Sequence, residues 1–363
     1  MSPPGRRARQ AGIVGAVVGV AAAGLATAFA VERVLVRRSL RAPGDPYADE
    51  EFGAQPFDSE LTVTAADGTD LHVEVVEPKQ PSTGTRPTVV FVHGFCLDMG
   101  TFYFQRKVLA ERGELRLVFY DQPGHGRSGR LESGEYDIAA LGTSLAAVLD
   151  ATCPDGPIVL VGHSMGGMTI MAFAERFPQW FGNRVVGVVM MSTSGGLIDT
   201  AKIGIPSLVA RASAPLLPLV NGTARLTGSA IDRARMASSD LAWLLTRRYG
   251  FGDPRPSPSL VSFVERMNSK TSAETVAKYL RTLYTHARHP ALAALGGTPT
   301  LVLVGTRDMI TPVAHSEEIL RYLPDATFVK VDNSGHVVML ENADEVNAAL
   351  LPFLESLTAT EAQ

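Results

Sequence analysis

A serine between two glycines is the first candidate for chemistry in this sequence. Ser164 lies in the pentapeptide GHSMG at residues 162–166, which fits the pattern G-x-S-x-G. The apolar run IVLV at 158–161 precedes it, and a helical pattern begins at Met165. A nucleophile elbow requires this strand–turn–helix setting, because the tight turn presents the serine hydroxyl above the sheet. The sequence therefore predicts Ser164 as a catalytic nucleophile, with a purely structural glycine turn as the alternative.

A serine hydroxyl needs a base to remove its proton before it attacks well. His336, in the segment NSGH at 333–336, follows the last predicted strand and precedes a helical C-terminus. It fits the chain order serine, acid, histidine, so we predict His336 as the base. The other histidines lie in the hairpin, in loops, inside the elbow, at the end of an insertion or at a helix start: His72, His93, His125, His163, His286, His289 and His315.

The base in turn needs a carboxylate that fixes its tautomer and stabilises its charged form. Asp308, in GTRD at 305–308, follows the apolar run 301–304. The loop after that strand should reach the same edge of the sheet as Ser164. We therefore predict Asp308 as the acid, with Asp199, which follows the strand-like segment 184–192, as the alternative.

Acyl transfer also needs hydrogen-bond donors for the developing oxyanion. The backbone N–H of Met165, directly after the nucleophile, is one candidate. The loop after the apolar run 88–93 should supply the other, and we predict the N–H of Phe95, since Gly94 lets the backbone approach closely. An ordinary glycine turn is the alternative reading of this loop.

Short apolar runs rich in β-branched residues predict the strands that position these groups. The runs are 61–65, 71–77, 88–93, 115–120, 157–162, 184–192, 298–305 and 326–331, and helical patterns include 164–177 and 343–357. Asp67-Gly68 marks a hairpin between the first two runs. Strands that alternate with helices predict an α/β fold, with a mostly parallel eight-stranded sheet flanked by helices.

One stretch breaks this alternation. Residues 195–290 contain no convincing buried strand, and helical patterns at 240–249 and 272–286 dominate. Because the insertion lies between strands whose carboxyl ends should line the site, it predicts a helical cap, with a plain structural extension as the alternative. The expected organisation is a core in two parts, 61–194 and 291–363, with the cap at 195–290.

The N-terminal residues differ in kind from the rest. No charge occurs from residue 11 to 31, which at about 1.5 Å per residue could cross a bilayer of about 30 Å. We therefore expect one transmembrane anchor within 1–41, and hence membrane association and localisation. A secretory signal cleaved near residues 26–30, giving a secreted protein, and a buried helix are the alternatives. The Pro-rich, acidic residues 42–60 read as a linker.

Composition excludes several classes of protein. With 45% hydrophobic and 19% charged residues among 363, the chain is too apolar to be disordered. Its net charge of -4 gives no basic excess for nucleic acid. Cys96 and Cys153 form neither a metal spacing nor a disulfide framework, and we interpret them as buried thiols. The spacing of His286 and His289 lacks further ligands, so no metal or cofactor is expected.

The motifs together resemble the α/β-hydrolase fold-1 family. They are HGF at 93–95, DQPGHGRS at 121–128, GHSMGG at 162–167, GTRD at 305–308 and SGH at 334–336. The resemblance covers about residues 61–357 and implies the α/β-hydrolase fold. Members that this chain resembles include esterases, monoacylglycerol lipases, cofactor-free haloperoxidases and carbon–carbon bond hydrolases. Serine at the elbow is unlike the epoxide hydrolases and haloalkane dehalogenases of that family, which place Asp there.

We therefore expect a serine hydrolase that cleaves a small-molecule or lipid ester through an acyl-enzyme. The apolar segment 203–220 of the predicted cap suggests a hydrophobic acyl group. A haloperoxidase or perhydrolase, or a carbon–carbon bond hydrolase, would use the same triad. A non-catalytic binding protein is the alternative from another class, but binding alone gives no reason for Ser164, Asp308 and His336 at three such loops.

Overall fold

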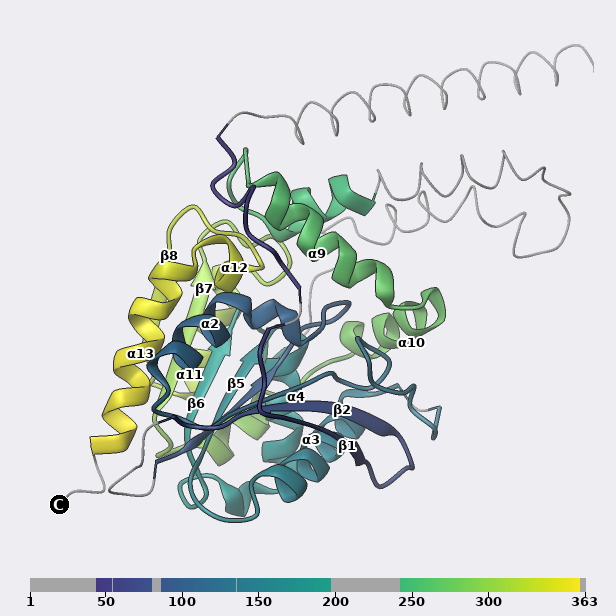
Figure 1. Ribbon diagram of the computed structural model, residues 1–363. Helices are drawn as coiled ribbons and strands as arrows, with labels where there is room; N and C mark the ends of the chain where they lie inside the picture. The colour runs from purple at the N-terminus through teal and green to yellow at the C-terminus, as the bar shows by residue number, and fades with distance from the viewer. Residues whose placement is uncertain (1–43, 54, 80–85, 135, 197–241, 360–363) are drawn as a thin grey trace, which may run out of the picture. The chain divides into compact units, whose positions relative to one another are not determined.

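A computed structural model gives the structure of the protein and describes residues 44–53, 55–79, 86–134, 136–196 and 242–359 (Figure 1). The chain divides into two compact units. One comprises Met1–Pro46 and Ser207–Leu245, most of which lies outside the described residues. The other comprises Tyr47–Pro206 and Thr246–Gln363 and contains the sheet and the candidate site.

Among the described residues, eight strands form one sheet in the order β1-β2-β4-β3-β5-β6-β7-β8. β1 pairs antiparallel with β2, and β2 with β4, whereas the remaining pairs are parallel. This confirms the predicted mostly parallel eight-stranded sheet. The strands are β1 (Ser59–Thr64), β2 (Asp70–Val76), β3 (Thr88–Val92), β4 (Leu117–Tyr120), β5 (Ile158–His163), β6 (Val185–Met191), β7 (Thr300–Gly305) and β8 (Thr327–Val331).

Burial explains why the central strands are continuous apolar runs. Every residue of β4, β5 and β7 is buried, because helices cover both faces of a parallel sheet. The edge strands β1 and β8 are largely exposed or half-buried and carry polar residues. Each large apolar side chain buried in the central strands contributes about 1.5–3 kcal/mol to folding.

Helices cover both faces of the sheet. α3 and α4 pack against each other, and α4 also lies along β5 and the 3₁₀ segment η3 (His289–Leu295). α13 packs on α2, α12 and β6 (Figure 1). Leu357 of α13 fills the space above Gly187 in β6. The helices are α2 (Tyr103–Arg112), α3 (Ile138–Thr152), α4 (Met165–Arg176), α11 (Val313–Tyr322), α12 (Val338–Glu341) and α13 (Ala343–Ala359).

The described part of the predicted cap is helical. α9 (Pro258–Lys270) and α10 (Ala273–Tyr284) each begin after a serine whose hydroxyl accepts from the backbone N–H of the third residue of the helix. Ser257 and Ser272 are these N-caps, at 3.2 Å in both cases. Residues 197–241, which include the apolar segment 203–220, lie outside the described residues. The boundaries of the cap remain a prediction.

The predicted membrane anchor requires correction. Among the described residues, no helix is long and apolar enough to cross a membrane. The longest helix there, α13, has 17 residues, whereas a bilayer crossing needs about 20 consecutive apolar residues. The expected transmembrane segment, membrane association and membrane localisation are contradicted and are withdrawn. The segment 1–41 itself lies outside the described residues.

Candidate active site

Ser164 lies in a strained turn between β5 and α4. Its backbone has φ 52° and ψ -117°, a conformation that costs a non-glycine residue about 1–3 kcal/mol. Two contacts with the end of β6 hold it: Ser164 N donates to Met191 O at 2.9 Å, and Thr193 Oγ1 donates to Ser164 O at 2.7 Å. The sequence predicted a nucleophile elbow here, and the observed turn has the backbone that such an elbow needs.

Two glycines allow the backbone around this turn to pack closely. A Cβ at Gly166 would lie 1.9 Å from the carbonyl oxygen of Val92, at the end of β3. A Cβ at Gly94 would lie 2.7 Å from Nδ1 of His163. The loop after β3 therefore packs directly against the first turn of α4, and a side chain at either glycine would force the two elements apart.

Three predicted residues from distant loops meet at the carboxyl ends of the strands. His336 Nε2 lies 2.9 Å from Ser164 Oγ, and His336 Nδ1 lies 2.9 Å from Asp308 Oδ2. Ser164 follows β5, Asp308 follows β7 and His336 follows β8. All three side chains are buried, and Ser164 is 8% exposed. With the Nδ1 proton directed to Asp308, Nε2 is free to accept the serine proton.

Asp308 is held as a carboxylate by hydrogen bonds. Its Oδ1 accepts from the N–H groups of Ile310 and Thr311 at 2.8 and 2.9 Å, and its Oδ2 accepts from Thr311 Oγ1 at 2.9 Å. Burial raises the pKa of Asp308, but the charge and hydrogen bond of His336 and the two backbone N–H groups outweigh it. The net pKa lies below the ordinary value, so Asp308 is ionised at neutral pH.

A half-buried glutamate that no motif indicated anchors the loop of His336. Glu341 in α12 accepts from the N–H of Gly335 at 2.6 Å and from the N–H of Gly252 at 2.9 Å. Burial raises the pKa of Glu341, although the N–H groups of Asp253, Gly252 and Gly335 oppose this. Sequence offered only its position five residues after His336, which does not distinguish an anchor from an ordinary helix residue.

His163, inside the elbow, contacts the backbone of the proposed base. Its Nε2 lies 2.9 Å from the carbonyl oxygen of His336, so Nε2 carries the proton and donates. Burial lowers the pKa of His163 to about 3, which keeps the ring neutral at physiological pH. His163 therefore fixes the backbone of His336, a role that the pentapeptide pattern alone does not indicate.

The predicted oxyanion donors, Phe95 and Met165, belong to the loop after β3 and to the first turn of α4, which pack against each other. Met165 is the first residue of α4, where a helix leaves its N–H groups without intrahelical partners. Phe95 lies in the loop after β3, next to Gly94. This loop passes close to the nucleophile, since a Cβ at Gly94 would lie 3.2 Å from Ser164 Cβ. Within the described part of the chain, neither N–H donates a hydrogen bond to another residue.

The other histidines and the cysteines that the structure describes have contacts outside this triad. The alternative acid Asp199 lies outside the described residues. His93 and His125 are buried in the adjoining loops, with ring centroids 5.5 Å apart. His286 Nε2 donates to the carbonyl oxygen of Ser194, and His289 contacts Glu318. Both cysteines are free thiols: Cys153 is buried as expected, whereas Cys96 is only half-buried.

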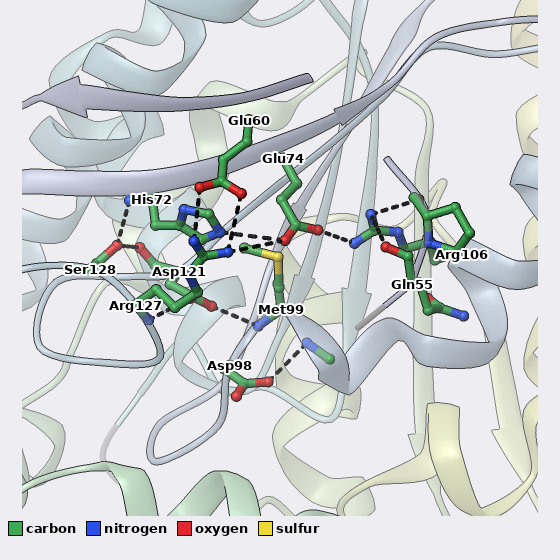
Figure 2. A network of polar contacts seen from close by, with 12 residues as sticks. Gln55, Glu60, His72, Glu74, Asp98, Met99, Arg106, Asp121, Arg127 and Ser128 are labelled. Carbon is green, nitrogen blue, oxygen red and sulfur yellow. Dashed lines mark hydrogen bonds and ion pairs between the residues drawn. The ribbon is translucent and has the colours of Figure 1, made fainter. Parts of the chain in front are cut away.

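One cluster of the described residues has the side chains of a metal site. Ligand atoms of Glu60, His72 and Glu74 lie within 4.8 Å of one another. Arginines already neutralise the two carboxylates, because Arg127 contacts Glu60 at 2.8 Å and Arg106 contacts Glu74 at 2.6 Å (Figure 2). The cluster is therefore an ion-pair network that joins β1 and β2 to helix α2 and to the loop after β4, and it does not fit a cation.

Comparisons with known proteins agree on the fold. Residues 87–343 match the family model for the alpha/beta hydrolase fold. An sn-1-specific diacylglycerol lipase from Mus musculus is 27% identical, over 74% of this chain and 81% of its own length. A non-heme haloperoxidase from Rhodococcus erythropolis is 28% identical, over 81% of this chain and 99% of its own. A solved esterase from Thermogutta terrifontis shares the fold, with a TM-score of 0.63 and 24% identity over 83% of this chain and 99% of that one.

Proposed function

This chain belongs to the alpha/beta hydrolase fold family, and on this premise we propose that it is a serine hydrolase that cleaves carboxylic esters of hydrophobic acyl groups. One observation carries the proposal. The chain of contacts from Asp308 to His336 to Ser164, at 2.9 Å each, is the arrangement that activates a serine hydroxyl.

In the proposed reaction, His336 Nε2 takes the proton of Ser164 as Oγ bonds to the carbonyl carbon of the ester. The N–H groups of Phe95 and Met165 stabilise the oxyanion of the tetrahedral intermediate. When the intermediate collapses, the alcohol leaves with the proton from His336, and the acyl group stays on Ser164. Water then gives a proton to His336 as it attacks the acyl carbon. When this second intermediate collapses, the acid leaves and His336 returns the proton to Ser164 Oγ.

The surroundings of the site support an apolar acyl group. Phe95 packs against a buried apolar cluster that includes Met168 of α4 and Tyr279 of α10. The same cluster includes Met165, which directly follows Ser164, and apolar surroundings favour hydrocarbon over charged substrates. The relative named as a diacylglycerol lipase points to the same class of ester.

A second candidate is perhydrolysis, in which hydrogen peroxide replaces water in the attack on the acyl-enzyme and releases a peroxyacid. The haloperoxidase relative, which this chain matches over 99% of its length, is the observation that favours it. The same three residues would form the acyl-enzyme, so the two candidates differ only in the second nucleophile.

Hydrolysis of p-nitrophenyl esters of increasing acyl length tests the proposal. We expect the rate to rise from short to medium chains, and Ser164→Ala to lower kcat by at least about 10⁴-fold. Ser144→Ala is the matched control, because Ser144 is a buried serine of α3 that bonds to Ala140 O. Equal rates for Ser164→Ala and wild type would refute the proposal. Peroxyacid formation with added hydrogen peroxide measures the second candidate.

A further inference from the structure

The two proposed oxyanion donors come from separate elements. Phe95 N belongs to the loop after β3, whereas Met165 N opens α4. A catalytic constellation must hold its groups to within about 0.5 Å of the productive geometry. A side chain that ties this loop to this helix would therefore control how well the two N–H groups point at one oxygen atom.

The side chain of Gln122 makes this tie. Gln122 follows β4 and is fully buried. Its Nε2 donates to the carbonyl oxygen of His93, two residues before Phe95. Its Oε1 accepts from Thr169 Oγ1 at 2.7 Å, one turn of α4 after Met165. One amide group thus spans from the oxyanion loop to the nucleophile helix.

The chemistry of its partners fixes which way the Gln122 amide points. The His93 carbonyl oxygen can only accept, so the NH₂ group of Gln122 must face it. That leaves Oε1 for the hydroxyl of Thr169, which is able to donate. The reversed amide would place two acceptors together in a buried site, which costs the desolvation of both groups.

The backbone of Gln122 acts on the same loop through the ring of His93. Gln122 N–H donates to His93 Nε2 at 2.8 Å, so the ring proton is on Nδ1, which donates to Gly94 O at 2.8 Å. Leu97 N also donates to Gly94 O, at 3.3 Å. The Gly94–Phe95 peptide is trans, so its C=O and N–H point in opposite directions. Holding the Gly94 oxygen therefore sets the direction of the Phe95 N–H.

We propose that Gln122 is a positioning residue for the oxyanion hole, which aligns the Phe95 N–H with the Met165 N–H without touching the substrate. This inference rests on the proposed hydrolase function. If Gln122 contributed only to folding, its substitution would lower stability without a specific effect on the transition state. The experiment must therefore separate transition-state stabilisation from folding and from substrate binding.

Gln122→Met removes the amide and keeps the length of the side chain. We expect kcat for a p-nitrophenyl ester to fall by about 10- to 100-fold, as for a displaced catalytic group, with KM within about twofold of wild type. The affinity for a trifluoromethyl ketone, whose adduct with serine carries an oxyanion, should weaken by the same factor as kcat/KM. Gln105→Met is the control, because Gln105 is also fully buried and bonds to Met339 O and Asn347 rather than to the loop of Phe95 or to α4.

Thr169→Val is the second variant and decides the test should Gln122→Met fail to fold. It removes the hydroxyl that donates to Gln122 Oε1 at 2.7 Å and lies 3.0 Å from Met165 O one turn earlier in α4, and it keeps the branched shape of the side chain. We expect kcat and ketone affinity to fall together by several-fold, with KM unchanged. A folded variant with wild-type kcat and ketone affinity, or one no different from Gln105→Met, would overturn the inference and leave the hydrolase function standing. A wild-type protein without esterase activity would instead reject the proposed function.

Discussion

Two of the histidine–carboxylate pairs among the described residues are buried, and they differ in what surrounds them. His336 lies 2.9 Å from Asp308, and His72 lies 3.4 Å from Glu74. Arg106 contacts Glu74 at 2.6 Å and Arg127 does so at 3.8 Å (Figure 2). In the described part of the chain, the other groups that donate to Asp308 are neutral N–H and O–H groups of Ile310 and Thr311.

The difference indicates that a carboxylate must keep an unneutralised negative charge in order to assist a base. A carboxylate that an arginine already neutralises gains little from a second positive charge beside it. Asp308 has no such partner among the described residues, so its charge is available to stabilise an imidazolium at His336. The other ring nitrogen of His336, Nε2, contacts the hydroxyl of Ser164. His72 contacts a serine only through its backbone, whose N–H donates to Ser128 Oγ and anchors a loop. The first pair suits proton transfer, and the second holds the sheet to its loops.

Among the substitutions that separate the two pairs, removal of the Asp308 charge should have the largest effect, and it should act on kcat. We expect Asp308→Asn to lower kcat for a p-nitrophenyl ester by about 10⁴-fold, because the amide favours the wrong tautomer of His336. Glu74→Gln, which makes the same chemical change in the other pair, should leave kcat of the folded protein within about twofold. Steady-state kinetics beside circular dichroism measure both. Similar losses in the two variants would erase the distinction.

Removal of Arg106 should affect stability instead. Arg106 and Glu74 are 5% and 7% exposed, so Arg106→Met leaves a buried carboxylate without its main partner. Breaking one side of a buried ion pair costs about 3–5 kcal/mol of unfolding free energy. Urea unfolding followed by fluorescence measures it. Arg112→Met is the control, because its pair with Glu355 is on the surface and should contribute less than about 1 kcal/mol. Equal effects of the two substitutions would contradict the prediction.

The Glu74 network should also give stability a dependence on acid, which is the smallest effect expected. Burial raises the pKa of Glu74, but hydrogen bonds from His72 and Arg106 and the charge of Arg106 outweigh it, so the net pKa lies below 4.5. A carboxylate that is more acidic in the folded state stabilises the protein above its unfolded pKa and ceases to do so as pH falls through the folded pKa.

We therefore expect wild type to exceed Glu74→Gln in urea midpoint at neutral pH, and the gap to narrow steadily below pH 4.5. Unfolding curves at a series of pH values measure the gap. Glu77→Gln is the control on the same strand end, where the carboxylate pairs with Arg116 and its side chain is 48% exposed. A gap that widens in acid would show that Glu74 does not stabilise the fold as a carboxylate.

The sequence predicted the fold well because its strongest signals are local. Continuous apolar runs marked the central strands, since helices cover both faces of a parallel sheet and leave no polar side. The three residues that the loops after β5, β7 and β8 contribute were named from motif and chain order, and the structure brings them together. Parallel strands end at one edge, which explains why such distant residues meet.

The supporting contacts could not be predicted, because they join residues with no motif and no periodicity between them. Gln122 and Thr169 are 47 residues apart, and Arg106 and Glu74 are 32 apart. Each pairing depends on which loop packs against which helix, and that follows only from the assembled sheet. The membrane prediction came from length and absence of charge at residues 11–31, criteria that apply to any apolar run of small residues.

Labelling with a fluorophosphonate probe, located by mass spectrometry of the digested protein, tests the central claim that Ser164 is the activated nucleophile. We predict one modified residue, Ser164, in folded wild type. The labelling rate should be orders of magnitude lower in Asp308→Asn and about unchanged per folded molecule in Arg106→Met. No modification of Ser164, or an equal labelling rate in wild type and Asp308→Asn, would contradict the assignment.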